Sequence, residues 1–167
     1  MTVTINGNGT ITPTSAVNPT GSILQVLSTT KSDTTSTSST SFADIGLSQA
    51  ITPSATSSKI LISYDVYIGQ THSETSFINI VRGSTTIAQP STSANYPATT
   101  LRYIGNPSSV QIMSTHNMRY LDSPSTTSAI TYKLQWRVDS NTIYLNRYNA
   151  NDNYHGISSL TLMEIAG

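Results

Sequence analysis

The segment Ser158-Ser-Leu-Thr-Leu-Met-Glu-Ile-Ala-Gly167 has the pattern of a β-strand. Side chains alternate between the two faces of a strand, so Leu160 and Leu162 share one face. A strand in a sheet with one wet face carries its apolar residues on one side only, but here both faces are apolar. We therefore expect Leu160 and Leu162 to face the chain's own core and the other face to meet a neighbouring chain. The residues expected to face the neighbour are Ile157, Met163 and Ile165.

Other segments repeat this two-residue period. Lys59 to Ile68 has an apolar side chain at every second position, and Ala129 to Val138 alternates in the same way. Gly, Pro, Asn and Asp residues separate such segments, and no long segment has a helical period. The remaining strands are expected near residues 22–28, 42–51, 76–82, 85–88, 100–104, 110–121 and 142–147. Residues 42–51 could form either one short strand or a pair of them.

This pattern predicts an all-β protein. Long connections mixed with tight hairpins favour a jelly-roll β-sandwich of about 8–10 antiparallel strands over a simple meander. In a jelly roll the first and last strands pair, which would place Ile23 to Leu27 beside Leu160 to Ile165. Asp139-Ser-Asn141 is interpreted as a hairpin turn that returns residues 142–147 beside the preceding strand. The Ser- and Thr-rich run 28–41 is interpreted as a long loop or an irregular edge strand.

Residues 1–20 differ from the rest of the chain. Asn6-Gly7 and Asn8-Gly9 favour tight turns, because Asn and Gly tolerate positive φ. We therefore predict a short N-terminal arm or hairpin over residues 1–20, used for attachment, ahead of a domain over residues 21–167. The alternative is a frayed terminus. The apolar residues expected to make the attachment are Val3, Ile5 and Ile11.

Composition excludes several partners. Charged residues make up 10% of the 167 residues, and eight Lys and Arg balance eight Asp and Glu. Nucleic acid and anionic membranes both attract an excess of positive charge, so neither is expected as a partner. There is no cysteine, which excludes disulfides and thiolate metal sites. Neither a signal peptide nor a membrane-inserted segment is recognisable, so synthesis in a cytoplasm is expected.

No motif for catalysis is present. The three histidines, His72, His116 and His155, form no H-E-x-x-H pattern, and neither a G-x-S-x-G elbow nor a phosphate-binding P-loop occurs. We therefore expect no enzymatic activity, no cofactor and no metal site. His116 lies in the middle of a predicted strand, where it could face a three-fold axis or simply be hydrogen-bonded within the strand.

Three tyrosines gather near the last predicted hairpin: Tyr144, Tyr148 and Tyr154. Exposed tyrosine is common at binding surfaces, because the ring stacks on a ligand and the hydroxyl forms hydrogen bonds. These residues are a candidate ligand surface, for example for a glycan. Packing within the strands is the alternative.

Four phrases carry a resemblance: Gly21-Ser-Ile-Leu-Gln-Val-Leu-Ser-Thr-Thr-Lys31, Ile51-Thr-Pro-Ser-Ala-Thr-Ser-Ser-Lys-Ile-Leu-Ile62, Val81-Arg-Gly-Ser-Thr-Thr-Ile87 and Ser159-Leu-Thr-Leu-Met-Glu-Ile165. Over residues 21–167 the chain resembles small all-β virion proteins of tailed bacteriophages. The resemblance implies a jelly roll like that of the tumour-necrosis-factor and C1q group, assembled as a homotrimer with the last strand near the three-fold axis. His116 would then join Ile157, Met163 and Ile165 at the trimer interface.

The resemblance also implies a role. One placement is a capsid decoration protein that stabilises the phage head, with its arm on the major capsid protein. The other is a tail fibre protein that binds a host receptor such as a surface glycan. The chain has no heptads or shaft repeats, which favours decoration. Either protein would be made in the host cytoplasm and released in virions on lysis.

Overall fold

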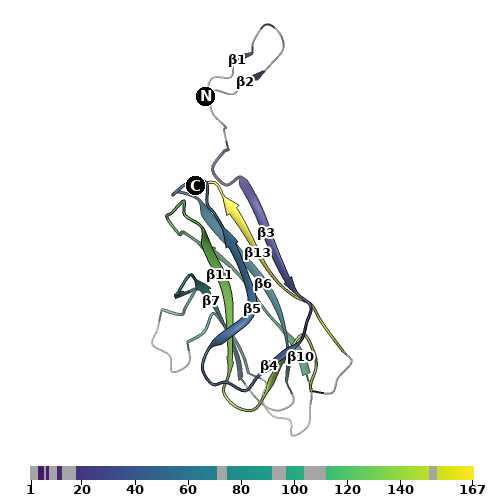
Figure 1. Ribbon diagram of the computed structural model, residues 1–167. Helices are drawn as coiled ribbons and strands as arrows, with labels where there is room; N and C mark the ends of the chain where they lie inside the picture. Colours follow the sequence, from purple (N-terminus) through teal and green to yellow (C-terminus); the bar gives the residue numbers. More distant parts are fainter. Residues whose placement is uncertain are drawn as a thin grey trace.

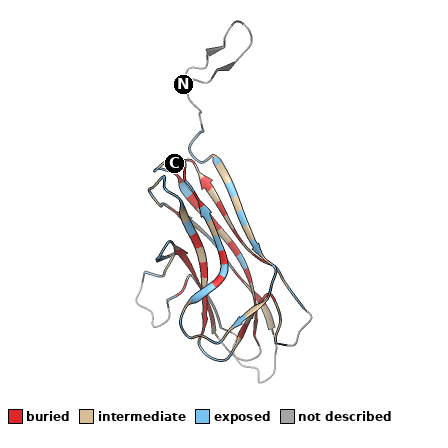
Figure 2. Cartoon of the chain, in the orientation of Figure 1, coloured by how far each residue is buried: buried red, intermediate tan, exposed pale blue. Residues whose placement is uncertain are grey.

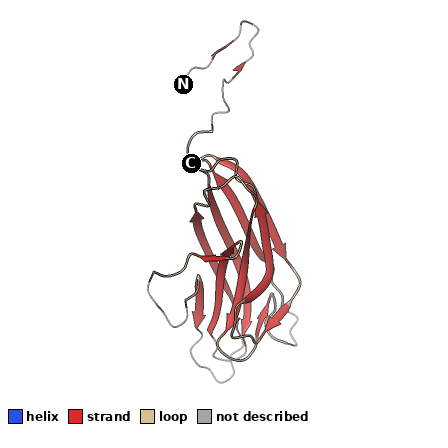
Figure 3. Ribbon diagram, turned by 60° about the vertical axis from the view of Figure 1, so that its left-hand side comes forward, coloured by secondary structure: helices blue, strands red, loops and turns tan. Residues whose placement is uncertain are grey.

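The computed structural model describes residues 4–5, 7, 11–12, 18–70, 75–91, 97–103, 112–150 and 154–167. Every regular element among them is a strand (Figure 3). In chain order the strands are β1 (Thr4–Ile5), β2 (Ile11–Thr12), β3 (Ile23–Lys31), β4 (Thr35–Thr37), β5 (Ala43–Ile51), β6 (Lys59–Gln70), β7 (Thr75–Arg82), β8 (Thr85–Ile87), β9 (Thr100–Tyr103), β10 (Ile112–Asp122), β11 (Ile130–Val138), β12 (Ile143–Leu145) and β13 (Ser158–Ile165).

Two antiparallel sheets pack face to face (Figure 1). In the first, the β6 sheet, β10 pairs with one edge of β6, and β13 and β12 share the other edge. Beyond them lie β3, beside β13, and β4, beside β12. In the second, the β7 sheet, the order is β5–β11–β7, with β8 and β9 on the far edge of β7. The long strands thus run β3–β13–β6–β10 and β5–β11–β7–β9, which is a jelly roll and confirms the predicted fold.

Strand β13 lies between β3 and β6. Leu162 is opposite Leu27 on one side and Ile62 on the other, so the predicted pairing of the first and last long strands is confirmed. The ladder shifts after Glu164, and Ile165 comes opposite Ile23. Both ends of the sandwich domain therefore lie at the same end of the sheet (Figure 1).

The core fills the space between the sheets. Leu160 and Leu162 are fully buried there, as predicted, together with every second residue of β6 from Ile60 to Ile68. Figure 2 shows buried positions alternating with more exposed ones along the long strands. Each fully buried Leu or Ile contributes about 1.5–3 kcal/mol relative to an exposed one, so this alternation is the main stabilisation of the fold.

One local prediction needs correction. The predicted hairpin of residues 129–138 with 142–147 is wrong, because the chain crosses after β11 to the β6 sheet, where β12 pairs with β4 and β6. There Ile143 and Leu145 are fully buried. Of the two interpretations of residues 42–51, β5 supports the single strand, with Gly46 in the left-handed region at φ 91°. Of the two interpretations of residues 28–41, β4 supports the edge strand.

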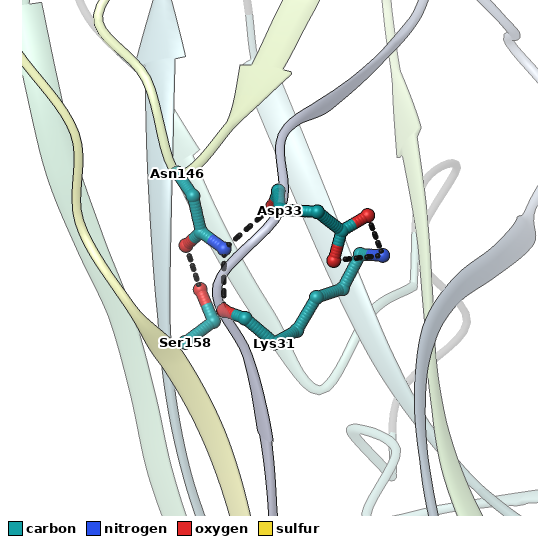
Figure 4. Close-up of polar contacts among 4 residues, drawn as sticks. All are labelled: Lys31, Asp33, Asn146 and Ser158. Carbon is teal, nitrogen blue, oxygen red and sulfur yellow. Dashed lines mark hydrogen bonds and ion pairs between the residues drawn. The ribbon is translucent and has the colours of Figure 1, made fainter.

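Asn146 joins three segments at one end of the β6 sheet (Figure 4). Its Nδ2 donates to the carbonyl oxygens of Lys31 (2.6 Å) and Asp33 (3.1 Å), and its Oδ1 accepts from Ser158 Oγ (2.6 Å). The residue is fully buried and has φ 56°. The Asn146 side-chain amide thus provides a hydrogen-bond donor for two carbonyl oxygens in the turn between β3 and β4. It also holds the start of β13 through the Ser158 hydroxyl.

The predicted N-terminal hairpin is present as a backbone pairing. Thr4 is opposite Thr12 and Ile5 is opposite Ile11, in a two-stranded sheet of its own. Val3 lies outside the described residues. The use of this arm for attachment stays a prediction.

Candidate functional site

The outer face of the β6 sheet carries a continuous apolar patch. A row crosses four strands, from Val26 on β3 through Met163 and Leu61 to Leu121 on β10. The neighbouring row begins with Ile23 opposite Ile165. The apolar patch is defined as Ile23, Val26, Leu61, Leu121, Met163 and Ile165.

Half of the patch residues are strongly exposed. Ile23 is 58% exposed, Val26 52% and Leu121 47%, and the other members are half-buried. Single exposed aliphatic residues are ordinary, but a contiguous apolar area rimmed by polar residues marks an interaction site. We therefore take this face as the candidate functional site.

The same face is hollowed next to the apolar patch. A cavity of about 490 Å³, open to the outside, lies between β6 and β10. Arg119 is opposite Ser63, and Asn117 is opposite Asp65, so both strands contribute polar side chains. We call this cavity the polar groove. Its lining residues are Ser63, Tyr64, Asp65, Asn117, Met118 and Arg119.

The expected neighbour-facing residues do not all meet. Met163 and Ile165 lie together in the apolar patch. Both are on the outer side of β13, which is the side predicted to face a neighbouring chain. Ile157 is 60% exposed and precedes the first residue of β13, so it lies at the opposite end of that strand from Ile165. Only the first two therefore belong to one surface with the other patch residues.

His116 lies inside the sandwich. It is 3% exposed, its Nε2 is 2.7 Å from Ser76 Oγ, and its Nδ1 is 3.2 Å from Thr100 Oγ1. The Tyr64 hydroxyl shares the same Thr100 oxygen at 2.9 Å. This arrangement agrees with the hydrogen-bonded strand histidine, so we leave His116 out of the interface proposed below.

The three tyrosines form two separate contacts. Tyr148 and Tyr154 meet edge to face, with ring centroids 6.1 Å apart, and Tyr154 is 74% exposed. Tyr144 lies under the guanidinium of Arg147 instead, 4.9 Å from ring centroid to Cζ. Tyr144 lies in β12 and the other residues of these contacts follow it, at the end of the sandwich away from the apolar patch. Tyr154 is the one whose ring is widely open to a ligand.

Among the described residues no group of three or more His, Asp or Glu side chains is placed to hold a metal ion. In the same parts of the chain no helix has the length and apolar character needed to cross a bilayer.

Glu164 is a buried carboxylate that the sequence pattern did not reveal. It follows Leu160 and Leu162 on the inner face of β13 and is 1% exposed. Its Oε1 accepts from Ser54 N (2.7 Å) and Ser54 Oγ (2.6 Å), and its Oε2 accepts from Gln25 Nε2 (2.6 Å). Burial raises the pKa of this carboxyl, but the hydrogen bonds outweigh it and lower the pKa to about 2.

This depressed pKa makes stability sensitive to acid. The ionised form contributes above the ordinary pKa of 4.5, and the contribution is lost as the pH falls from there toward 2. We expect the free energy of unfolding to drop by about 1–3 kcal/mol across that window, measured by urea denaturation at a series of pH values. The Glu164→Gln variant should show a flatter profile. An unchanged slope in the variant would contradict the assignment.

Comparison with solved structures finds distant similarity to viral proteins. No protein-family model and no curated protein matches the sequence. A structure of the infectious bursal disease virus Gx strain is similar over 93% of this chain and 47% of that one, with 11% identity and a TM-score of 0.41. The VP2 subviral particle of infectious bursal disease virus is similar over 100% of this chain and 42% of that one, with 12% identity and a TM-score of 0.37. The chain thus spans less than half the length of either.

Proposed function

We propose that the chain is a non-enzymatic structural protein of a tailed-phage virion, a homotrimeric surface protein that decorates and stabilises the capsid. The observation that carries the proposal is the apolar patch on the outer face of the β6 sheet. Three of its side chains are about half exposed, and only burial against another chain would remove them from water. The resemblance of residues 21–167 to phage virion proteins supports the same role.

In this proposal the apolar patch and the N-terminal arm have different tasks. The apolar patch includes β13, the strand that the resemblance places near a three-fold axis, so it serves the contact between copies. The arm, with Val3, Ile5 and Ile11, serves attachment to the major capsid protein. The protein is made in the host cytoplasm and released with virions on lysis.

A tail fibre protein is the second candidate. The exposed ring of Tyr154, braced by Tyr148, favours it, because such a ring can stack on a receptor glycan. Cryo-electron microscopy of labelled virions separates the two roles. Copies spread over the icosahedral lattice support decoration, whereas copies confined to the tail contradict it and support the fibre.

The trimer is tested by the Met163→Asp substitution. A charge in the centre of the apolar row would have to be desolvated on association, so we expect the association constant to fall by at least about tenfold. Sedimentation equilibrium at micromolar concentration measures it. The matched control is Thr131→Asp, which places the same charge on the exposed outer face of the β7 sheet.

The control should sediment like the parent chain. A parent chain that is monomeric at this concentration would refute the homotrimer. Equal association constants for the two variants would show that the contact between copies does not involve the apolar patch.

A further inference from the structure

Most charged side chains in the described parts of the chain are held by a partner within the chain. Ion pairs join Lys31 to Asp33, Arg82 to Asp122 and Lys133 to Asp44. Aromatic rings or hydrogen bonds hold Arg137, Arg147, Asp139 and Glu164. Among the charged residues whose side chains the structure describes, those with neither an ion pair nor a hydrogen bond are Lys59, Asp65 and Arg119.

These three side chains lie on one face. Lys59, Asp65 and Arg119 are all exposed positions on the outer side of β6 and β10. Lys59 is opposite Ile165, beside the apolar patch, whereas Asp65 and Arg119 line the polar groove. The charges left unpaired by the chain itself are therefore concentrated next to its exposed apolar residues.

The polar groove carries one charge of each sign, Arg119 and Asp65. Arg119 is opposite Ser63, and Asp65 is two positions further along β6, so one positive and one negative charge stand in adjacent rows. A partner with a strong excess of one sign would be repelled by one of the two. Another copy of this chain presents the same pair, so around a ring the Arg119 of each copy can meet the Asp65 of the next.

The groove is also continuous with the apolar patch. Leu61 and Leu121 form the row next to Ser63 and Arg119 on the same two strands. A copy seated on the apolar patch would therefore reach the groove. This continuity favours a second copy of the chain over a small ligand as the occupant.

We infer that the polar groove receives a second copy of this chain, with Arg119 of one copy paired to Asp65 of the next. The inference rests on the self-association proposed above. The apolar patch supplies affinity, but burial of apolar surface has no preferred direction. The ion pair supplies the register, because mismatched copies would bring like charges together.

Charge reversal tests the pairing. The single variants Asp65→Arg and Arg119→Asp should each weaken association at least about tenfold, since like charges would then face one another across the contact. The double variant should associate within about threefold of the parent chain, because the pair is restored with its signs exchanged. Sedimentation equilibrium at low and high salt gives the constants, and Thr131→Arg on the opposite sheet is the control.

A mixture of the two single variants decides between pairing within a chain and pairing between chains. Each variant supplies the charge that the other lacks, so the equimolar mixture should associate more strongly than either variant alone. In a ring of three, two copies of one variant and one copy of the other would form two contacts between opposite charges and one between like charges. Pairing within one chain cannot produce this recovery, and a mixture that stays as weak as its components overturns the inference.

The other outcomes are equally informative. If the parent chain is monomeric, both the proposed homotrimer and this inference fail. If the parent chain assembles and the single reversals assemble equally well, the register contact is overturned while the homotrimer stands. Circular dichroism shows whether each variant is folded, and the neutral variants Asp65→Asn and Arg119→Gln replace any reversal that is not. Those neutral variants should weaken association by less than the reversals do, and parent-like association in both would overturn the pairing.

Discussion

Replacing Asp122 with alanine is expected to lower the free energy of unfolding by about 3 kcal/mol, because the carboxylate has a fully buried tyrosine and a half-buried arginine as partners. Asp122 ends β10 and is 6% exposed. Its oxygens accept from Arg82 Nη1 at 2.9 and 3.0 Å, and Oδ2 accepts from the Tyr132 hydroxyl at 2.6 Å. The carboxylate thus ties the β6 sheet to β7 and β11 of the opposite sheet.

Tyr132 accounts for much of the expected loss in the free energy of unfolding. Tyr132 is fully buried, and burial together with the adjacent carboxylate raises the pKa of its hydroxyl well above the usual value. The hydroxyl therefore stays a hydrogen-bond donor over the ordinary pH range. Without Asp122 it would have no acceptor, and an unsatisfied buried polar group costs about 1–3 kcal/mol.

Asp44→Ala is the matched control for this variant. Asp44 also accepts from a cation and a second polar group, Lys133 at 2.9 Å and Gln135 at 2.8 Å, but it is exposed on the outer face of the β7 sheet. Exposed ion pairs contribute about 0–1 kcal/mol, so its loss should be small. Urea denaturation of both variants measures the difference. Comparable losses would show that the buried network adds nothing beyond a surface pair.

The second large effect is expected from Gly69→Ala. Gly69 lies on β6 between Met113 of β10 and Tyr144 of β12. A Cβ atom there would overlap the backbone carbonyl oxygens of Arg147 and Tyr148. Overpacking typically costs 1–3 kcal/mol and occasionally more, and backbone atoms cannot rotate out of the way as the end of a flexible side chain can. We therefore expect a loss of at least about 3 kcal/mol, measured by thermal denaturation.

Gly156→Ala provides the comparison. Its added methyl group would first meet the terminal methyl of Met113 at 2.7 Å, which is the far end of a flexible side chain. That side chain can change rotamer, so we expect a loss of about 1 kcal/mol. Equal melting temperatures for the two alanine variants would mean that the close approach at Gly69 is relieved by a backbone shift.

The sequence predicted those parts of the fold that depend on alternation within one strand. The buried faces of β6, β11 and β13 follow from residues spaced two apart, and Gly83 with Ser84 gives a hairpin at the expected place. The partner of β12 was predicted wrongly. A turn such as 139–141 has the same local chemistry whether the chain folds back or crosses to the opposite sheet. The two cases differ only in the partners of β12, which are β4 and β6.

The candidate site was only partly predictable. Met163 and Ile165 were recognised because a single strand shows two apolar faces. The rest of the apolar patch is created by register, which brings Val26, Leu61 and Leu121 into one row from three distant segments. Glu164 was missed because its hydrogen-bond donors, Ser54 and Gln25, come from distant parts of the chain.

The chain leaves the sandwich where it entered. Gly21 N donates to Ala166 O at 2.7 Å, and Ala166 N donates to Ser22 O at 2.8 Å, so the start of β3 and the end of β13 are tied together. Tyr154 lies beyond the opposite end of β13, whose eight residues span roughly 27 Å. A peptide fused after Gly167 would therefore be presented at the end from which the arm departs, whereas a peptide inserted near Tyr154 would be displayed at the far tip.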